Sequence, residues 1–220
     1  TLSTHMFQVG GIEVLQRLGV CDKILATGAP PITNCYMQFE DVDLSGPPRV
    51  RKNDSNVPLL CVRRISLDIR LVEMAQEAGV DMRLNTRVVE LLKQDGRVNG
   101  VRVARRDGRT STIHADLVVG ADGRLSTVAR LTGARRYHVV PSERMSSWAY
   151  YRGVPRQPVA KIYYHRRGDD FVVAAPADDD LFVIAVCPSV EYSDSYRNDN
   201  EAAFRRAVSG CEPVAEFLLG

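Results

Sequence analysis

The sequence lacks the features that would place this protein in a membrane or on nucleic acid. No apolar run approaches the roughly 20 residues that a bilayer-crossing helix needs, and no signal peptide is visible. The formal net charge is only +2, which gives no sign of a nucleic-acid partner. We therefore expect neither a membrane span nor a nucleic-acid partner.

Cysteine is also sparse. The five cysteines lie far apart and never form a Cys-x-x-Cys pair, which argues against a zinc site, so no metal site is predicted. Their odd number argues against a disulfide scaffold, and a reducing, cytoplasmic location fits best. The cysteines are Cys21, Cys35, Cys61, Cys187 and Cys211.

The overall composition is that of an ordinary soluble globular protein. The 220 residues suit one large domain or two small ones, and 45% hydrophobic with 25% charged residues provide a real core. Apolar spacing predicts a first helix that ends at Gly19. It predicts a second helix with Ser66 as N-cap and Gly79 as its end, followed by a short strand over 80–84.

The middle of the chain changes to a period of two. Asp95-Gly96 and Asp107-Gly108 are hairpin signals within residues 86–114, so the pattern predicts a three-stranded antiparallel meander. Residues 115–120 (ADLVVG) suit a strand buried on both faces. A sharp turn and a helix from Ser126 follow. Beyond residue 140 the sequence is rich in strands, predicted at 148–151, 161–164, 171–174 and 181–187.

The strand, turn and helix around Asp122 carry the most chemistry. Gly123 permits a backbone conformation that a side chain hinders, and ligands bind α/β sheets at the carboxyl ends of strands. Ser126 can cap a helix whose N-terminus favours an anion such as a pyrophosphate. The alternative is a purely structural turn, because Asp-Gly is a common turn dipeptide.

The whole stretch 116–130 (DLVVGADGRLSTVAR) resembles the second dinucleotide fingerprint of single-component flavoprotein hydroxylases, relatives of the geranylgeranyl reductases. The resemblance implies that Asp122 and Gly123 lie close to both FAD and the nicotinamide coenzyme. Arg130 is expected to anchor the helix. The order of elements agrees with this family over about residues 1–150.

Three further segments extend the resemblance. Arg64 takes the place of an arginine that, in the family, reaches the phosphate or ribityl region of FAD. A guanidinium suits this task because it offers a planar fork of donors to phosphate. Arg63 is the second choice for the same role. Val88 occupies the strand whose backbone touches adenine in relatives. Ser3-Thr4-His5 resembles a segment near the flavin ring, so His5 is a candidate to bind substrate; a polar histidine at a chain end is the alternative.

The resemblance implies an α/β fold. We expect an incomplete FAD/NAD(P)-binding domain of glutathione-reductase type with an antiparallel meander over residues 1–138. Residues 139–220 are expected to form the start of a second domain, a mixed β-sheet substrate domain. Residues 30–62 could contribute to that second domain. The family's N-terminal Gly-x-Gly-x-x-Gly, which holds the pyrophosphate, is absent, so an internal fragment is expected.

The implied function is FAD-dependent oxidation and reduction. NAD(P)H would reduce the flavin, which would then support hydroxylation or double-bond reduction of an apolar or aromatic small molecule. Tyr150, Tyr151, Tyr163 and Tyr164 are candidates to line the substrate sheet, although aromatic residues also favour strands for packing alone. The alternative is an inert remnant or binding module; a nicotinamide-dependent dehydrogenase is disfavoured because the fingerprint is missing.

Overall fold

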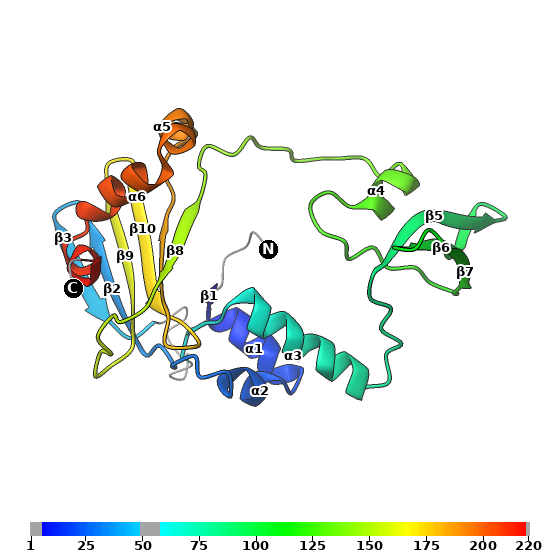
Figure 1. The fold of residues 1–220 in the computed structure, drawn as a ribbon, viewed down its shortest axis with the longest axis horizontal. Helices are drawn as coiled ribbons and strands as arrows, with labels where there is room; N and C mark the ends of the chain where they lie inside the picture. Colours follow the sequence, from blue (N-terminus) through cyan, green and yellow to red (C-terminus); the bar gives the residue numbers. More distant parts are fainter. Residues whose placement is uncertain (1–5, 49–57, 219–220) are drawn as a thin grey trace. The chain divides into compact units, whose positions relative to one another are not determined.

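The computed structural model describes residues 6–48 and 58–218 (Figure 1). The chain divides into two compact units. One combines Thr1–Ala78 with Ser142–Gly220 and is called the sheet unit; the other, Gly79–Pro141, is called the meander unit. The fold is mixed α/β, as the sequence predicts. No helix among the described residues is long and apolar enough to span a membrane.

Three helices and a pair of short strands form the N-terminal part of the sheet unit (Figure 1). Their apolar faces share one core, in which Ile12, Ile24 and Leu60 are almost fully buried. Gly19 ends the first helix in the left-handed conformation that the sequence predicts, with φ of 69°. The elements are β1 (Met6–Phe7), α1 (Val9–Arg17), α2 (Cys21–Leu25), β4 (Leu60–Cys61) and α3 (Arg64–Glu77).

The start of α3 differs from the prediction. The helix begins at Arg64 with Arg63 as its N-cap residue, so the assignment of Ser66 as N-cap was wrong. The Ser66 hydroxyl instead donates to the Asp178 carboxylate at 2.5 Å, and the Arg63 backbone N–H donates to the same carboxylate at 2.8 Å. Asp178 thus satisfies the helix end from a distant turn, which a local cap pattern cannot reveal.

A six-stranded sheet dominates the sheet unit, with the order β3-β2-β9-β10-β11-β8. Neighbouring strands are antiparallel except that β2 runs parallel to β9. Early and late segments of the chain therefore share one sheet, since β2 lies in the first quarter of the sequence. The strands are β2 (Asn34–Phe39), β3 (Val42–Gly46), β8 (Ser147–Tyr151), β9 (Lys161–Arg167), β10 (Asp170–Pro176) and β11 (Phe182–Val186).

The two faces of this sheet pack against different elements. On one face Val172 and Ile184 contact Phe204 and Val208 of a C-terminal helix. On the other face the apolar side chains of β9, β10 and β11 pack with the α1 and β4 region. The C-terminal segments, seen in orange and red in Figure 1, are α5 (Ser193–Asn198), α6 (Asn200–Ser209) and α7 (Glu212–Ala215).

The meander unit confirms the predicted antiparallel meander. Its strands β5 (Thr86–Gln94), β6 (Arg97–Arg105) and β7 (Thr110–His114) pair in sequence order. Asp95 and Gly96 both have positive φ, 52° and 78°, the geometry of the tight hairpin turn that Asp-Gly favours.

Two predicted strands are absent from the described sheets. Residues 80–84 and 115–120 are irregular, and Leu117 and Val119 are 76% and 75% exposed. A strand needs a neighbour to accept its backbone hydrogen bonds, and the described residues place none beside either segment. The helix that follows, α4 (Thr127–Thr132), has Ser126 as its N-cap, as predicted.

Candidate functional site

Asp122 lies at the N-terminal end of α4 and is exposed. Its carboxylate accepts hydrogen bonds from the Ser126 hydroxyl, from Thr127 N at 2.6 Å and from Val128 N at 3.2 Å. The hydrogen bond from Ser126, together with those from the backbone, lowers the pKa of Asp122. The carboxylate is therefore held anionic at the positive end of a helix, and the turn around it is fixed.

The two glycines near this turn, Gly120 and Gly123, have different structural roles. Gly123 has φ of 77°, and an added Cβ would meet nothing within 4 Å, so its backbone is open to an approaching group. A Cβ on Gly120 would lie 2.7 Å from Cβ of Val128. Gly120 therefore lets the segment pack closely on α4, while Gly123 leaves space beside the turn.

Arg64 is the first residue of α3. Its guanidinium donates two hydrogen bonds to Asp68, from Nε at 2.7 Å and from Nη2 at 2.8 Å. The hydrogen bond to Asp68 raises the pKa of Arg64. This partner one turn along the helix holds the guanidinium in a defined orientation, about one-third exposed.

Arg63 has a different environment. Its side chain donates from Nε and Nη2 to Asp178, each at 3.0 Å. Burial raises the pKa of Asp178, but the hydrogen bonds from Arg63 and Ser66 outweigh burial and lower it overall. The Asp178 side chain is almost inaccessible. Arg63 is thus committed to a buried ion pair that fixes α3 to the β10–β11 turn.

Val88 lies on β5, an edge strand of the meander sheet. The pairing of β5 with β6 is irregular between Val88 and Glu90. Such a bulge takes a backbone group out of the ladder and re-aims it. In this unit α4 packs on β5, so the helix that follows Asp122 and Gly123 contacts the strand that carries Val88.

The predicted site residues fall in three places. Arg64 belongs to the sheet unit, whereas Val88, Asp122 and Gly123 belong to the meander unit. His5 lies outside the described residues. The structure thus brings three of the five together within one unit.

A family model described as an FAD binding domain matches residues 3–208 of the chain. The chain belongs to this family. The predicted resemblance to FAD-dependent oxidoreductases is confirmed by this match.

Two curated relatives of this FAD binding domain agree with the resemblance. Rifampicin monooxygenase of Rhodococcus hoagii is 31% identical over 140 residues, which are 63% of this chain and 26% of the relative. Digeranylgeranylglycerophospholipid reductase 1 of Methanococcoides burtonii is 40% identical over 79 residues, which are 36% of this chain and 19% of the relative. The chain thus matches only a minor part of either enzyme.

A solved structure supports the fold. The myxobacterial chondrochloren halogenase CndH, an FAD-dependent halogenase, is similar with a TM-score of 0.80 at 20% identity. The similarity covers 99% of this chain and 51% of the halogenase. At that identity it shows the fold alone, and the FAD binding domain described here spans about half of the halogenase.

The sheet of this FAD binding domain separates the four candidate tyrosines by face. Tyr163 meets Phe217 edge-to-face and Phe182 at a tilt, with ring centroids 5.7 Å and 6.3 Å away, under the C-terminal helices. Tyr151 packs against the same core. Tyr150 and Tyr164 pack on the opposite face. All four tyrosines thus pack on the sheet, and Tyr150 and Tyr164 share the face opposite the C-terminal helices.

The face with Tyr164 carries a row of side chains that crosses the sheet. Strand register aligns Trp148, Ala185, Val173, Tyr164, Met37 and Leu44 on adjacent strands. Trp148, Tyr164 and Met37 are half-buried, and Gln8 donates to the Tyr164 hydroxyl at 2.8 Å. Sequence reasoning missed Trp148 and Met37 as members of this surface. Alternation along each strand was visible, but the parallel pairing that aligns Met37 with Tyr164 was not.

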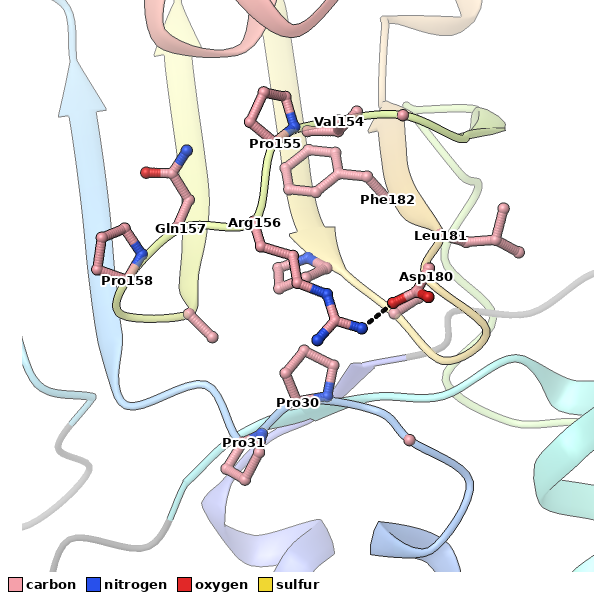
Figure 2. A pocket seen from close by; sticks show the side chains of 15 residues that line it. Pro30, Pro31, Val154, Pro155, Arg156, Gln157, Pro158, Asp180, Leu181 and Phe182 are labelled. Atoms are coloured by element: carbon pink, nitrogen blue, oxygen red, sulfur yellow. Dashed lines mark hydrogen bonds and ion pairs between the residues drawn. The ribbon is translucent and has the colours of Figure 1, made fainter.

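A pocket lies at one end of the sheet unit (Figure 2). Its volume is about 480 Å³, and three loops form it: 28–31, 153–160 and 176–182. Its wall is mostly apolar, and an ion pair joins Arg156 to Asp180 across it. None of the residues predicted to bind FAD lines this pocket.

Proposed function

We propose that the protein is an FAD-dependent oxidoreductase, driven by NAD(P)H, that hydroxylates an apolar or aromatic small molecule or reduces a double bond in one. The observation that carries this proposal is the family match over residues 3–208. The relatives are named as a monooxygenase, a reductase and a halogenase. A catalytically inert module is not favoured.

Three local features, each described within its own unit, support the proposed binding of a dinucleotide. Gly123 leaves open space beside an exposed turn, Arg64 presents an oriented guanidinium, and β5 has an irregular edge at Val88. Arg63 is held by buried Asp178, whereas Arg64 pairs with partly exposed Asp68, and this difference favours Arg64 as the arginine that faces the cofactor. These groups belong to the proposed incomplete FAD/NAD(P)-binding domain of glutathione-reductase type.

Each residue has a proposed task. Arg64 binds the phosphate or ribityl region through its planar donors. Asp122 holds the turn, so that the backbone at Gly123 can approach FAD and the coenzyme. The backbone at Val88 contacts adenine. Bound FAD supplies the hydride and electron chemistry, and no side chain is assigned as a catalytic acid or base.

The substrate surface is the sheet face that carries Trp148 and Tyr164. The half-buried members of its row, Trp148, Tyr164 and Met37, can exclude water and contact a flat apolar substrate. Burial raises the pKa of Tyr164, so its hydroxyl stays protonated at neutral pH and available as a donor. His5 is a further candidate to contact the substrate.

The test is a flavin absorbance spectrum of the purified protein, titrated with NADH and then NADPH in air, with hydrogen peroxide monitored. A bound flavin bleached by either coenzyme supports the proposal. Asp122→Ala is expected to weaken FAD retention or flavin reduction about tenfold, as for loss of a charge-assisted contact. Unchanged flavin content and reduction rate would reject the role of Asp122.

Thr132→Ala is the matched control, because the Thr132 hydroxyl donates within the same helix, to Val128 O and Ala129 O, and has no assigned contact with FAD. An equal loss in Thr132→Ala would assign the effect to the helix and not to the turn. Arg64→Gln is expected to weaken FAD binding while leaving the fold intact, since its partner Asp68 is partly exposed.

A further inference from the structure

The pocket at the end of the sheet is built from rigid elements. Five of its lining residues are prolines: Pro30, Pro31, Pro155, Pro158 and Pro176. Proline fixes its own φ, so walls of this composition lose little conformational entropy when a ligand binds. Phe182, which is almost fully buried, supplies an aromatic surface. The volume of about 480 Å³ lies within the usual range for small-molecule sites.

One cation dominates the polar part of the pocket. Figure 2 shows Arg156 extended across it, between Pro155 and Pro30, toward Asp180. Both side chains of this ion pair are largely exposed, so the pair is weak and easily exchanged. A guanidinium has five N–H donors, and the contact with Asp180 leaves most of them available to a second anion.

Two of the three nearby carboxylates are paired with other arginines. Asp178 is neutralised by Arg63, and Asp179 accepts from Arg152 at 2.8 Å. Asp180 is the remaining member of the three successive aspartates, and it is held in a tight turn with φ of 53°. Arg156 projects from the 153–160 loop on a long side chain. Its guanidinium can therefore reorient toward a ligand while the turn that holds Asp180 keeps its conformation.

We propose that this pocket binds a flat aromatic carboxylate. The ring lies among the proline rings and Phe182, and the carboxylate accepts two parallel hydrogen bonds from Arg156. The charge of Arg156 selects an anion, and the rigid apolar walls select a planar ring. The site involves no residue assigned to FAD, so its occupancy does not depend on the proposed oxidoreductase activity.

The test uses the 220-residue chain and the probe 1-naphthoate, followed by backbone amide NMR shifts. We expect saturable shifts at Gly28, Gly153 and Asp180, which surround the pocket. The neutral analogue 1-naphthalenemethanol is expected to bind about tenfold more weakly, as for loss of one charge-assisted pair. Arg156→Gln should raise the Kd for 1-naphthoate about tenfold and leave that of the alcohol unchanged.

Two variants sharpen the result. Asp180→Asn removes the competing carboxylate and should lower the Kd, the opposite sign to Arg156→Gln. Arg152→Gln is the control, because Arg152 also pairs with an aspartate of this turn but does not line the pocket; its Kd should match the parent chain. The proposal is overturned if 1-naphthoate shifts no pocket amide, if Arg156→Gln binds it equally well, or if 1-naphthylmethylammonium binds more tightly.

Discussion

The sheet unit and the meander unit bury their apolar residues to very different extents. In the sheet unit, both faces of the central strands are packed, and Ile162, Ala174 and Ile184 have no accessible surface. In the meander unit, Leu91 and Val103 are the large apolar side chains that are buried among the described residues. Leu117, Val119 and Leu125 stand largely exposed.

This contrast shows where the stability of the chain resides. Hydrophobic burial is the dominant favourable term in folding, so the sheet unit has the material for an independent core. Leu117 and Val119 stay exposed, so the segment 115–120 adds little apolar burial to the meander unit.

The largest expected effect is in the sheet core. Ile184→Ala should lower the free energy of unfolding by about 3 kcal/mol, because it removes buried methyl groups and leaves a cavity. Trp148 is the single tryptophan and lies on β8 of the same sheet, so its fluorescence in denaturant reports this unit. The matched variant Val119→Ala should change that value by less than about 0.5 kcal/mol. A comparable loss in both variants would contradict the contrast.

The meander unit can be broken at Gly100. A Cβ there would lie 2.3 Å from the Ile113 carbonyl oxygen, so Gly100→Ala should force β6 and β7 apart, at about 2 kcal/mol. Hydrogen exchange of β7 amides should accelerate while Trp148 fluorescence stays unchanged. Gly46→Ala is the control, because its Cβ meets nothing within 4 Å. Slow exchange in Gly100→Ala would show that the strands can adapt.

The third prediction concerns the buried carboxylate of Asp178, at the junction between α3 and the sheet. Asp178→Asn should destabilise the sheet unit by about 2 kcal/mol, because hydrogen bonds to a charged group are lost. The folded pKa of Asp178 is lowered, so its contribution is present above the unfolded value of about 3.9 and is lost as pH falls through the folded pKa. Asp178→Asn should therefore flatten the acid limb of unfolding; an unchanged limb would remove Asp178 from this role.

The smallest expected effect is a gain. Asp180 has φ of 53° in the β10–β11 turn, a conformation that costs a side chain about 1 kcal/mol and glycine almost nothing. Asp180→Gly should raise the stability of the sheet unit by somewhat less than that, because an exposed ion pair is also lost. The midpoint of Trp148 fluorescence unfolding measures it. A drop in the midpoint would mean that the pair with Arg156 outweighs the strain.

Local chemistry in the sequence accounts for much of the fold. Asp95-Gly96 predicted a hairpin, and Gly19 and Gly79 predicted helix ends, because each depends on neighbouring residues alone. The parallel pairing of β2 with β9 and the capping of α3 by Asp178 join segments far apart in the chain, and no local pattern encodes them. The prediction of a strand over residues 115–120 was wrong for a related reason. Apolar residues form a buried strand only where another strand lies beside them, and the local sequence does not show whether one does.

The candidate site was foreseeable in part. The motif around Asp122 identified the turn, and Ser126 was correctly predicted as the cap of α4. The sequence did not indicate that the carboxylate of Asp122 would itself bind the helix N-terminus, since this depends on side-chain orientation. The sequence also could not show that Tyr150 shares a face of the sheet with Tyr164, and Tyr151 with Tyr163. Which side chains share a face depends on how the strands pair.

The parallel pairing of β2 with β9 has a consequence for biosynthesis. Gln38 and His165, which lie side by side in β2 and β9, are separated by 127 residues. At typical translation rates, β2 and β3 emerge on the order of ten seconds before β9 exists. During that interval β2 and β3 can pair only with each other, and the β9 edge of β2 at Met37 stays open, so a nascent chain is exposed to chaperones or to aggregation until the C-terminal half arrives.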